Sequence, residues 1–473
     1  MVSKGGGENI MIEYSSKEDL LQKAKAAEGK TVGEIDAKNR LDNKKSKGGL
    51  GQVVEESYFG YKVNSNTEPD FENLNIELKV TPFKRNKNGT LSAKERLVLN
   101  IINYMEEVQH DFYNSSFWRK NRQLLLMFYE WLPDIDRKDY KIVKSILFTY
   151  PEEDLEIIKQ DWEKIVSKIR DGKAHELSEG DTNYLGACTK GSNKNSLRKQ
   201  PYSDILAMQR AFSLKQSYMT TLVRKYINNE KLVSFTSESE LKKKSLNEIL
   251  VDKFNPHIGK TIKEIATEHG IKYNPKSKSF VPSIVSSFLG IKGTRLDDID
   301  EFAKANIEFK TVRLEPSGKP RESMSFENID FHQWTKETWE DSHIRQRFLN
   351  TKFLFVVFEY KETKRENPDR ELYFKGIKLW NMPYQTIETK IRELWEEVRL
   401  KIRTGIDIQY KKHGNKIIET NDLPKSGFNG VAHIRPKGAD GKDKVDLPNG
   451  QRITKQCYWL NSSYIAEILK ELD

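Results

Sequence analysis

The stretch that decides the fold is residues 69–82, which read PDFENLNIELKVTP. Apolar and polar residues alternate from residue 75 to residue 81, which predicts a β-strand with one buried face. Glu77 and Lys79 then lie on the same face of the strand, roughly 7 Å apart along the chain. Upstream, Pro69-Asp70 breaks regular structure and can turn the Asp70 carboxylate towards that face.

These side chains are of the kinds that phosphodiester hydrolysis requires. Asp70 and Glu77 can hold Mg²⁺ through hard oxygen ligands, and Lys79 can orient a water molecule and counter developing negative charge. The motif alone is weak, and a solvated strand face is the competing interpretation. Glu-x-Lys recurs elsewhere in this charge-rich chain, for example at Glu28, Glu240, Glu359 and Glu388.

A preceding acidic helix favours the catalytic interpretation. The i, i+3, i+4 spacing of Leu50, Val53, Val54 and Tyr58 predicts this helix, and Glu55 lies on it. A basic, polar segment follows the strand. The sequence therefore offers a third carboxylate close to the predicted metal site.

The chain also contains an internal repeat, which indicates two diverged copies of one unit. GKTVGEI at 29–35 recurs as GKTIKEI at 259–265, and NIELKV at 75–80 recurs as NIEFKT at 306–311. Further matches follow in the same order, including the apolar runs 124–130 and 353–359, each expected to be a central strand. We predict domains at 11–232 and 246–473, joined by a linker at 233–245, with residues 1–10 as a non-native leader.

Composition narrows the class of protein. The 473 residues carry a formal charge of +10 with a pI of about 9.1, which favours a polyanionic partner. Hydrophobic residues make up 36%, enough for folded cores. The two cysteines, Cys188 and Cys457, disfavour a disulfide scaffold and a cysteine zinc site, and a reducing cytoplasm is expected. No apolar run has the length of a membrane span.

With these residues in view, the sequence resembles the MutH-like endonucleases, and in particular the two-domain, Sau-type restriction enzymes that cut at GATC. Residues 47–55 (KGGLGQVVE) match the family's K-G-x-x-G-x-x-x-E helix, and residues 69–82 match its D…E-L-K-x-x-P core. The resemblance covers nearly the whole chain. Other segments that resemble the Sau-type branch are residues 84–85, 92–104, 174–180 and 200–205.

This resemblance implies a mixed α/β restriction-endonuclease-like fold of the PD-(D/E)xK type in two tandem domains, and Mg²⁺-dependent hydrolysis that leaves a 5′-phosphate. Asp70 and Glu77 become the metal ligands, Lys79 the water-orienting residue and Glu55 the supporting acid. A basic residue before the buried strand should approach the phosphate: Lys120 is the better match, and Arg122 is the alternative.

The resemblance also assigns DNA contacts in the first copy. Base reading in the family comes from a late loop, here residues 185–193, in which Lys190 is the matching basic residue. Contact with phosphate alone is an equally weighted interpretation of Lys190. Ser213 falls in the region that approaches the target adenine, at a position where MutH has an aromatic residue.

The second copy is expected to be an inactive DNA-binding effector. It keeps Glu308 and Lys310, and Asp300 or Glu301 could stand for Asp70, but Val285 takes the place of Glu55. Its recognition loop is the better match, because Arg435 and Lys437 fall on MutH's Arg-Pro-Lys. This copy would bind a GATC site and activate the first, as in a type IIE enzyme. His175 and His433 are expected to be structural or DNA-contacting rather than metal ligands, and residues 333–339 to be core or interface.

The implied partners are double-stranded DNA and a cognate methyltransferase, with a monomer that dimerises on DNA and no membrane association. Two alternatives remain open. The first is a MutH-type mismatch-repair nickase that depends on a partner ATPase, which the duplicated domain disfavours. The second is a DNA-binding regulator without catalysis.

Overall fold

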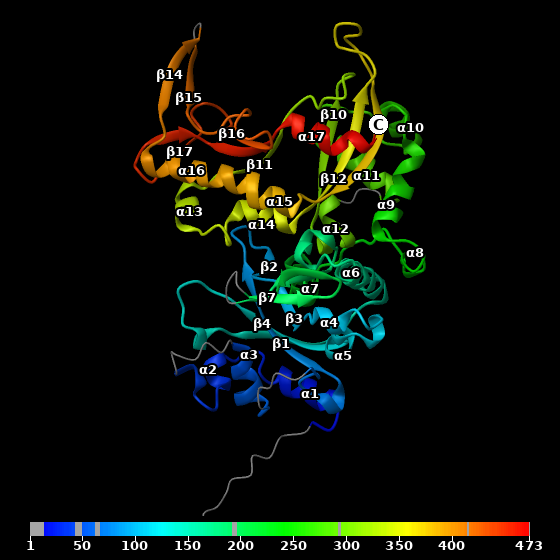
Figure 1. Cartoon of the computed structure of the whole chain (residues 1–473), viewed down its shortest axis with the longest axis vertical. Coiled ribbons are helices and arrows are strands. Elements are labelled where there is room, and N and C mark those ends of the chain that lie inside the picture. Colours follow the sequence, from blue (N-terminus) through cyan, green and yellow to red (C-terminus); the bar gives the residue numbers. More distant parts are fainter. Residues whose placement is uncertain are drawn as a thin grey trace, which may run out of the picture. The chain divides into compact units, whose positions relative to one another are not determined.

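The structure is a computed structural model that describes residues 14–42, 50–61, 67–191, 196–291, 295–413 and 416–472. The chain divides into two compact units, each described by itself (Figure 1). Unit 1 comprises residues 1–246 and 297–306, and unit 2 comprises residues 247–296 and 307–473. The leader predicted at residues 1–10 and the KGG of residues 47–49 lie outside the described residues.

Unit 1 is built on a four-stranded sheet with strand order β2-β1-β4-β5. β1 runs parallel to β4 with Glu77 opposite Leu124, and β2 and β5 pair antiparallel at the two edges. Residues 124–128 of β4 are fully buried, as their continuous apolar run predicts for a central strand. The strands are β1 Glu77–Arg85, β2 Leu91–Ala93, β4 Gln123–Glu130 and β5 Ile142–Thr149.

The N-terminal helices pack against one face of this sheet and share an apolar core with it. Ser16 caps α1 through the Asp19 N–H, and Leu20 and Ala24 bury its apolar side. The predicted helix around Leu50 is also present, but its second half is a π-helix. The elements are α1 Lys17–Lys25, α2 Val32–Ile35, η1 Arg40–Asp42, α3 Leu50–Val53, the π-helix η2 Val54–Tyr58 and η3 Glu72–Leu74.

A second, antiparallel sheet completes unit 1 with order β3-β9-β6, and β7 and β8 form a separate hairpin. The amphipathic helix α6 buries Ile157, Trp162 and Ile165. The remaining elements are β3 Leu97–Ile101, α4 Tyr104–Glu107, η4 Phe112–Asn114, α5 Ser116–Asn121, η5 Arg137–Asp139, α6 Glu152–Arg170, η6 Ala174–Glu176, η7 Glu179–Asp181, β6 Leu185–Thr189, β7 Leu197–Gln200, β8 Ser203–Met208, β9 Arg210–Leu214, α7 Gln216–Ile227, α8 Glu238–Leu241 and α12 Asp300–Ala305.

Unit 2 repeats this plan. Its sheet β10-β12-β13 has a parallel first pair and an antiparallel second pair, and Glu308 lies opposite Phe353 just as Glu77 lies opposite Leu124. The sheet β11-β19-β16 corresponds to β3-β9-β6. The strands are β10 Ile307–Leu314, β11 Met324–Asn328, β12 Lys352–Tyr360, β13 Leu372–Trp380, β14 Ile408–His413, β15 Lys416–Asn421, β16 Ala432–Pro436, β17 Lys444–Asp446, β18 Arg452–Thr454 and β19 Gln456–Leu460.

Helices cover the unit 2 sheets and share one apolar core with them. Trp334, Trp339, Phe353 and Trp395 all belong to this core, so the two tryptophans of residues 333–339 are core residues, as expected. The helices are α9 Leu246–Phe254, η8 Asn255–His257, α10 Ile262–Glu268, α11 Phe280–Phe288, η9 Leu296–Asp298, α13 Phe331–Lys336, α14 His343–Asn350, α15 Tyr384–Thr386, the π-helix η10 Ile387–Ile391, α16 Arg392–Thr404, α17 Ser462–Leu469 and η11 Lys470–Leu472.

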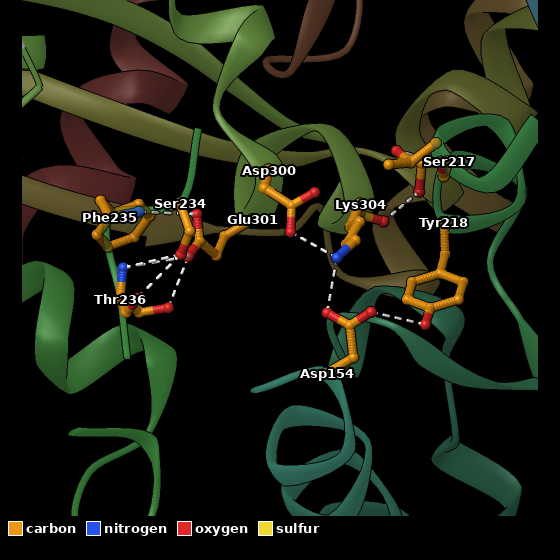
Figure 2. A network of polar contacts seen from close by, with 10 residues as sticks. Asp154, Ser217, Tyr218, Ser234, Phe235, Thr236, Asp300, Glu301 and Lys304 are labelled. Carbon is orange, nitrogen blue, oxygen red and sulfur yellow. Dashed lines mark hydrogen bonds and ion pairs between the residues drawn. The ribbon is translucent and has the colours of Figure 1, made fainter. Parts of the chain in front are cut away.

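Residues 297–306 pack in unit 1, although the chain continues from them into β10 of unit 2. The reason is the buried Lys304 of α12, whose Nζ binds Asp154 Oδ1 at 2.7 Å and Asp300 Oδ2 at 2.5 Å (Figure 2). Tyr218 donates its hydroxyl to the other Asp154 oxygen. A buried ammonium group needs such anionic partners, so the ion pair with Asp154 holds α12 in unit 1.

Among the described helices, none combines the length and the apolar composition that crossing a bilayer requires.

Candidate active site

Asp70 and Glu77 converge at the start of β1. The Asp70 N–H donates to Glu77 Oε2 at 3.1 Å, and the Leu78 N–H donates to Asp70 Oδ2 at 2.9 Å. These bonds hold the turn of Pro69-Asp70 against the strand, as the break in regular structure predicts. Glu77 is 3% exposed, so its carboxylate is oriented by the fold rather than by solvent.

Two lysines approach the same carboxylate oxygen. Lys79 Nζ lies 2.7 Å from Glu77 Oε1, because the two residues share a face of β1. Lys120 Nζ lies 3.8 Å from that oxygen and comes from α5, the helix immediately before β4. Of the two basic residues proposed from the sequence before the buried strand, Lys120 is thus the one that reaches Glu77.

Glu55 completes the cluster from the π-helix η2. Burial raises the pKa of its carboxyl group, the charge of Glu77 raises it further, and Lys79 and Lys120 act in the opposite direction. All four charged groups therefore lie within electrostatic reach of one another. The wider turn of a π-helix often marks a functional site, and here it carries Glu55.

The environment of Asp70 strongly favours the neutral acid. Burial, followed by the negative charges of Glu77 and Glu55, raises the pKa of Asp70 to about 7. Three carboxylates held this close repel one another, and a divalent cation would relieve that repulsion. Carboxylate oxygens are also the donors that Mg²⁺ prefers, so the residues present fit this ion.

The second copy replaces the metal-type cluster with ion pairs. Lys310 Nζ lies 2.6 Å from Glu308 Oε1, and the Arg347 guanidinium pairs with the other oxygen of Glu308. Burial alone would raise the pKa of Glu308, but Arg347 and Lys310 outweigh burial and lower it. Arg347 also binds Glu327, at 2.9 Å. Glu308 is thus a salt-bridged carboxylate.

The expectation that Asp300 or Glu301 could stand for Asp70 is wrong. Both lie on α12, within unit 1: Asp300 binds Lys304, and Glu301 accepts hydrogen bonds from the segment 234–236 (Figure 2). Their distance from Glu308 in the sequence suggested a counterpart of Asp70, but in the fold these two carboxylates have partners within unit 1. Val285 is fully buried in α11, so this helix carries no acid at the position compared with Glu55.

The predicted DNA-contacting residues fall into two groups. Lys190, Arg435 and Lys437 are exposed, and each of the two lysines follows the end of its strand, β6 or β16. Lys437 also donates to the Phe326 carbonyl oxygen at 2.7 Å, and the Arg435 guanidinium lies 5.2 Å from the centre of the Trp459 ring. Ser213, in contrast, is 1% exposed inside β9, and this burial argues against its predicted DNA contact.

The two histidines singled out in the sequence have structural partners. His433 is buried, and its Nδ1 lies 2.6 Å from Asn461 Oδ1. His175 Nδ1 lies 3.0 Å from Gln200 Nε2. Both observations agree with the expectation that neither histidine is a metal ligand.

Sequence reasoning missed Arg347, which decides the character of the second copy. Arg347 lies on α14, the helix before β12, as Lys120 lies on α5 before β4. The signal was available in principle: a basic residue on the helix that precedes the central strand of each copy. The segment containing Lys190 is only partly tested, because residues 192 and 193 lie outside the described part of the chain.

Comparisons with known proteins agree with this geometry. A family model described as DNA mismatch repair enzyme MutH matches residues 59–161 and 295–393, one match around each copy of the sheet. The chain is 37% identical to the type II restriction enzyme Sau3AI of Staphylococcus aureus, over 98% of this chain and 100% of that enzyme.

MutH proteins match part of the chain. The DNA mismatch repair protein MutH of Shewanella woodyi is 30% identical over 38% of this chain and 78% of its own length. That of Actinobacillus pleuropneumoniae is 26% identical over 45% of this chain and 96% of its own length. The chain therefore belongs to the MutH-like family of site-specific deoxyribonucleases, on the restriction-enzyme branch represented by Sau3AI.

Proposed function

We propose that this chain cuts both strands of duplex DNA at GATC in a Mg²⁺-dependent reaction that leaves 5′-phosphates. The active site lies in unit 1, and unit 2 binds DNA as an allosteric effector. The observation that carries the proposal is the convergence of Asp70, Glu77 and Lys79 at the start of β1. Whole-length similarity to Sau3AI supports the same specificity.

Each residue of the cluster has a role that follows from its contacts. Asp70 and Glu77 would hold the ion, which when bound supplies charge neutralisation at the scissile phosphate. Lys79, held against Glu77 at 2.7 Å, orients the attacking water and donates to it. Lys120 is placed to meet a phosphate oxygen, and Glu55 maintains the negative charge that attracts the ion.

Binding of Mg²⁺ depends on pH because Asp70 must release its proton to bind the ion. The pKa of about 7 means that a large share of Asp70 is protonated at neutral pH without the ion. Binding of the ion requires the carboxylate form, so binding displaces that proton. Cleavage at a fixed, limiting Mg²⁺ concentration should therefore rise between pH 6 and 8, in roughly the range of this pKa.

The proposed effector role of unit 2 rests on its exposed basic side chains and on the ion pairs that occupy Glu308. Arg435 and Lys437 present cations at the end of β16, and the hairpin β14–β15 adds the exposed Lys411 and Lys412. Glu308 is neutralised by its ion pairs, so the start of β10 is a poor site for Mg²⁺. Two DNA-binding units on one chain raise the effective concentration of each for the other's DNA.

Breaking both strands of a duplex needs two active sites or two successive nicks, and unit 1 of each chain offers one site. We therefore propose that a monomer dimerises transiently on DNA, in the cytoplasm of a bacterium that protects its own sites with a cognate methyltransferase. Analytical ultracentrifugation with and without a GATC duplex tests the dimer. A monomer on saturated DNA at cleaving concentrations would support two successive nicks instead.

The decisive experiment incubates the purified chain with plasmid and genomic DNA in Mg²⁺ and sequences the ends. We expect double-strand breaks at GATC with 5′-phosphates and no requirement for another protein. Nicks that appear only with a partner ATPase would identify a mismatch-repair nickase. Tight duplex binding with intact DNA would identify a regulator.

A further inference from the structure

A cluster of metal-ligating side chains lies in unit 2, in a part of the unit that the nuclease proposal does not use. His257, Glu268 and His269 each direct one ligand atom into a small volume in which the three atoms lie within 4.8 Å of one another. His257 ends the short helix η8, and the other two residues lie at the C-terminal end of α10. We propose that these three residues form a binding site for a divalent transition-metal ion of the zinc class.

The chemistry of the donors selects this class of ion. Two imidazole nitrogens and one carboxylate oxygen are ligands of Zn²⁺, whose sites of this composition leave a fourth position for water. Mg²⁺ and Ca²⁺ prefer oxygen donors alone, so this cluster would discriminate against the ion proposed for unit 1. Donors around tetrahedral zinc lie about 3.3 Å apart, a separation that small side-chain rotations reach from the distances present.

A second observation concerns the His257 ring. Within the described part of the chain, its buried Nδ1 has no hydrogen-bond partner. Buried polar atoms are nearly always paired, so the unpaired nitrogen on one of the three clustered residues is a second feature that a bound ligand would explain.

The ring is also held in place before any ion binds. His257 stacks on Phe288 with ring centres 4.0 Å apart and planes 9° apart. Phe288 in turn packs against Phe254 at 5.2 Å and Phe374 at 5.5 Å. A ligand whose orientation is fixed by packing loses little conformational freedom on binding, which favours the metal complex.

Lys260 competes with the ion. Its Nζ lies 2.9 Å and 2.8 Å from the two carboxylate oxygens of Glu268. The carboxylate must give up at least one of these contacts to bind a metal, and the ammonium charge repels a cation. Removing Lys260 should therefore tighten binding, a result that a purely structural ion pair would not produce.

The ion would fasten η8 to α10 at one edge of the unit 2 sheet. The segment between them already pairs with β13, since the Gly259 N–H donates to the Phe374 carbonyl and Thr261 bridges Tyr373. Cross-linking the two sides of this segment stabilises the folded state of unit 2 by mass action. The expected role is a structural clamp rather than catalysis.

The test is calorimetric titration of the full-length protein with ZnCl₂ in excess Mg²⁺, which occupies the carboxylate site of unit 1. We expect one zinc per chain, bound at least about tenfold more weakly in His257→Gln and in His269→Gln. His332→Gln, at an exposed histidine of the same unit, is the matched control and should bind like the parent. Lys260→Gln should bind more tightly.

A spectroscopic measurement keeps the proposal testable if a histidine variant misfolds, which circular dichroism would reveal. Co²⁺ in a tetrahedral nitrogen–oxygen site absorbs in the visible range, and Glu268→Gln alters only an exposed ligand. The bands should appear in the parent and change in Glu268→Gln. Zinc binding no tighter than Mg²⁺ binding, or equal binding by the parent and all histidine variants, would overturn the proposal.

Discussion

The starts of β1 and β10 share a backbone and differ in charge. Glu77 lies opposite Leu124 and Glu308 opposite Phe353, in the same parallel register. Around Glu77, three carboxylates face two ammonium groups, whereas Glu308 and Glu327 are balanced by Lys310 and Arg347. The first site has negative charge left over for a cation, and the second has none. A fold can thus be copied while the balance of charge around one strand changes through a few substitutions.

The largest expected effect comes from removing the same carboxylate in each copy. Asp70→Ala and Glu77→Ala should reduce cleavage by on the order of 10³-fold or more, because the ion loses a ligand, while DNA binding persists. Glu308→Ala should change the cleavage rate only a few-fold. Gel assays of supercoiled plasmid measure both. Equal losses in the two copies would show that unit 2 is also catalytic.

The next prediction concerns whether one substitution can give the second copy the carboxylate that corresponds to Glu55. Val285→Glu places a carboxylate in a fully buried position, so it should lower the free energy of unfolding by about 3 kcal/mol. Val251→Glu, at a 40% exposed valine of α9, is the control and should change stability by less than about 0.5 kcal/mol. Urea unfolding measures both values. A stable Val285→Glu protein with new nuclease activity would refute the comparison.

A smaller effect is expected at the DNA-contacting end of unit 2. Arg435→Ala should weaken binding to a GATC duplex by roughly 1–3 kcal/mol, and should reduce cleavage in parallel if unit 2 is the effector. Arg365→Ala, at an exposed arginine outside the proposed surface, is the matched control. Fluorescence anisotropy with cognate and scrambled duplexes distinguishes base reading from general phosphate contact. If Arg435→Ala lowers affinity for both duplexes equally, the side chain does not read sequence.

The smallest expected effect is the contribution of Asp70, in the first copy, to the pH dependence of the free energy of unfolding. The pKa of Asp70 is raised from 3.8 to about 7 in the folded protein, so the folded state binds more protons than the unfolded state between these values. The contribution of Asp70 to stability is therefore present below pH 4 and is lost as the pH rises through about 7. Asp70→Asn should flatten this fall, and its stability gain over the parent should be larger at pH 8 than at pH 5. Metal-free denaturant titrations at both pH values measure this difference.

Much of the candidate active site in unit 1 could be predicted from residues 69–82. Strand alternation placed Glu77 beside Lys79, and the Pro69-Asp70 break placed the second carboxylate, because both effects are local in the chain. The apolar spacing of its helix pointed to Glu55, but the role of Glu55 and the choice of Lys120 came from the resemblance, since helix packing brings both residues to β1 and no local pattern encodes that. The predicted central strands β4 and β12 are also confirmed.

The remaining features depend on tertiary packing. Linear spacing suggested that Asp300 or Glu301 replaces Asp70, but the buried ammonium of Lys304 holds their helix against Asp154. Ser213 looked available from its motif and is buried by the pairing of β9 with its neighbours. In the proposed zinc site, His257 lies more than ten residues before the adjacent pair Glu268 and His269, a separation without a recognisable spacing.

The position of α12 has a consequence for how this protein can be divided. Its last residues run directly into β10, yet Lys304 is matched to Asp154 of the first half of the sequence. A gene cut at residue 246 would leave Asp154 without its cation in one fragment, and in the other Lys304 would keep Asp300 but lose Asp154. The halves are therefore not exchangeable cassettes: a chimera between relatives should inherit residues 297–306 from the same parent as residue 154, although some 140 positions separate them in the printed sequence.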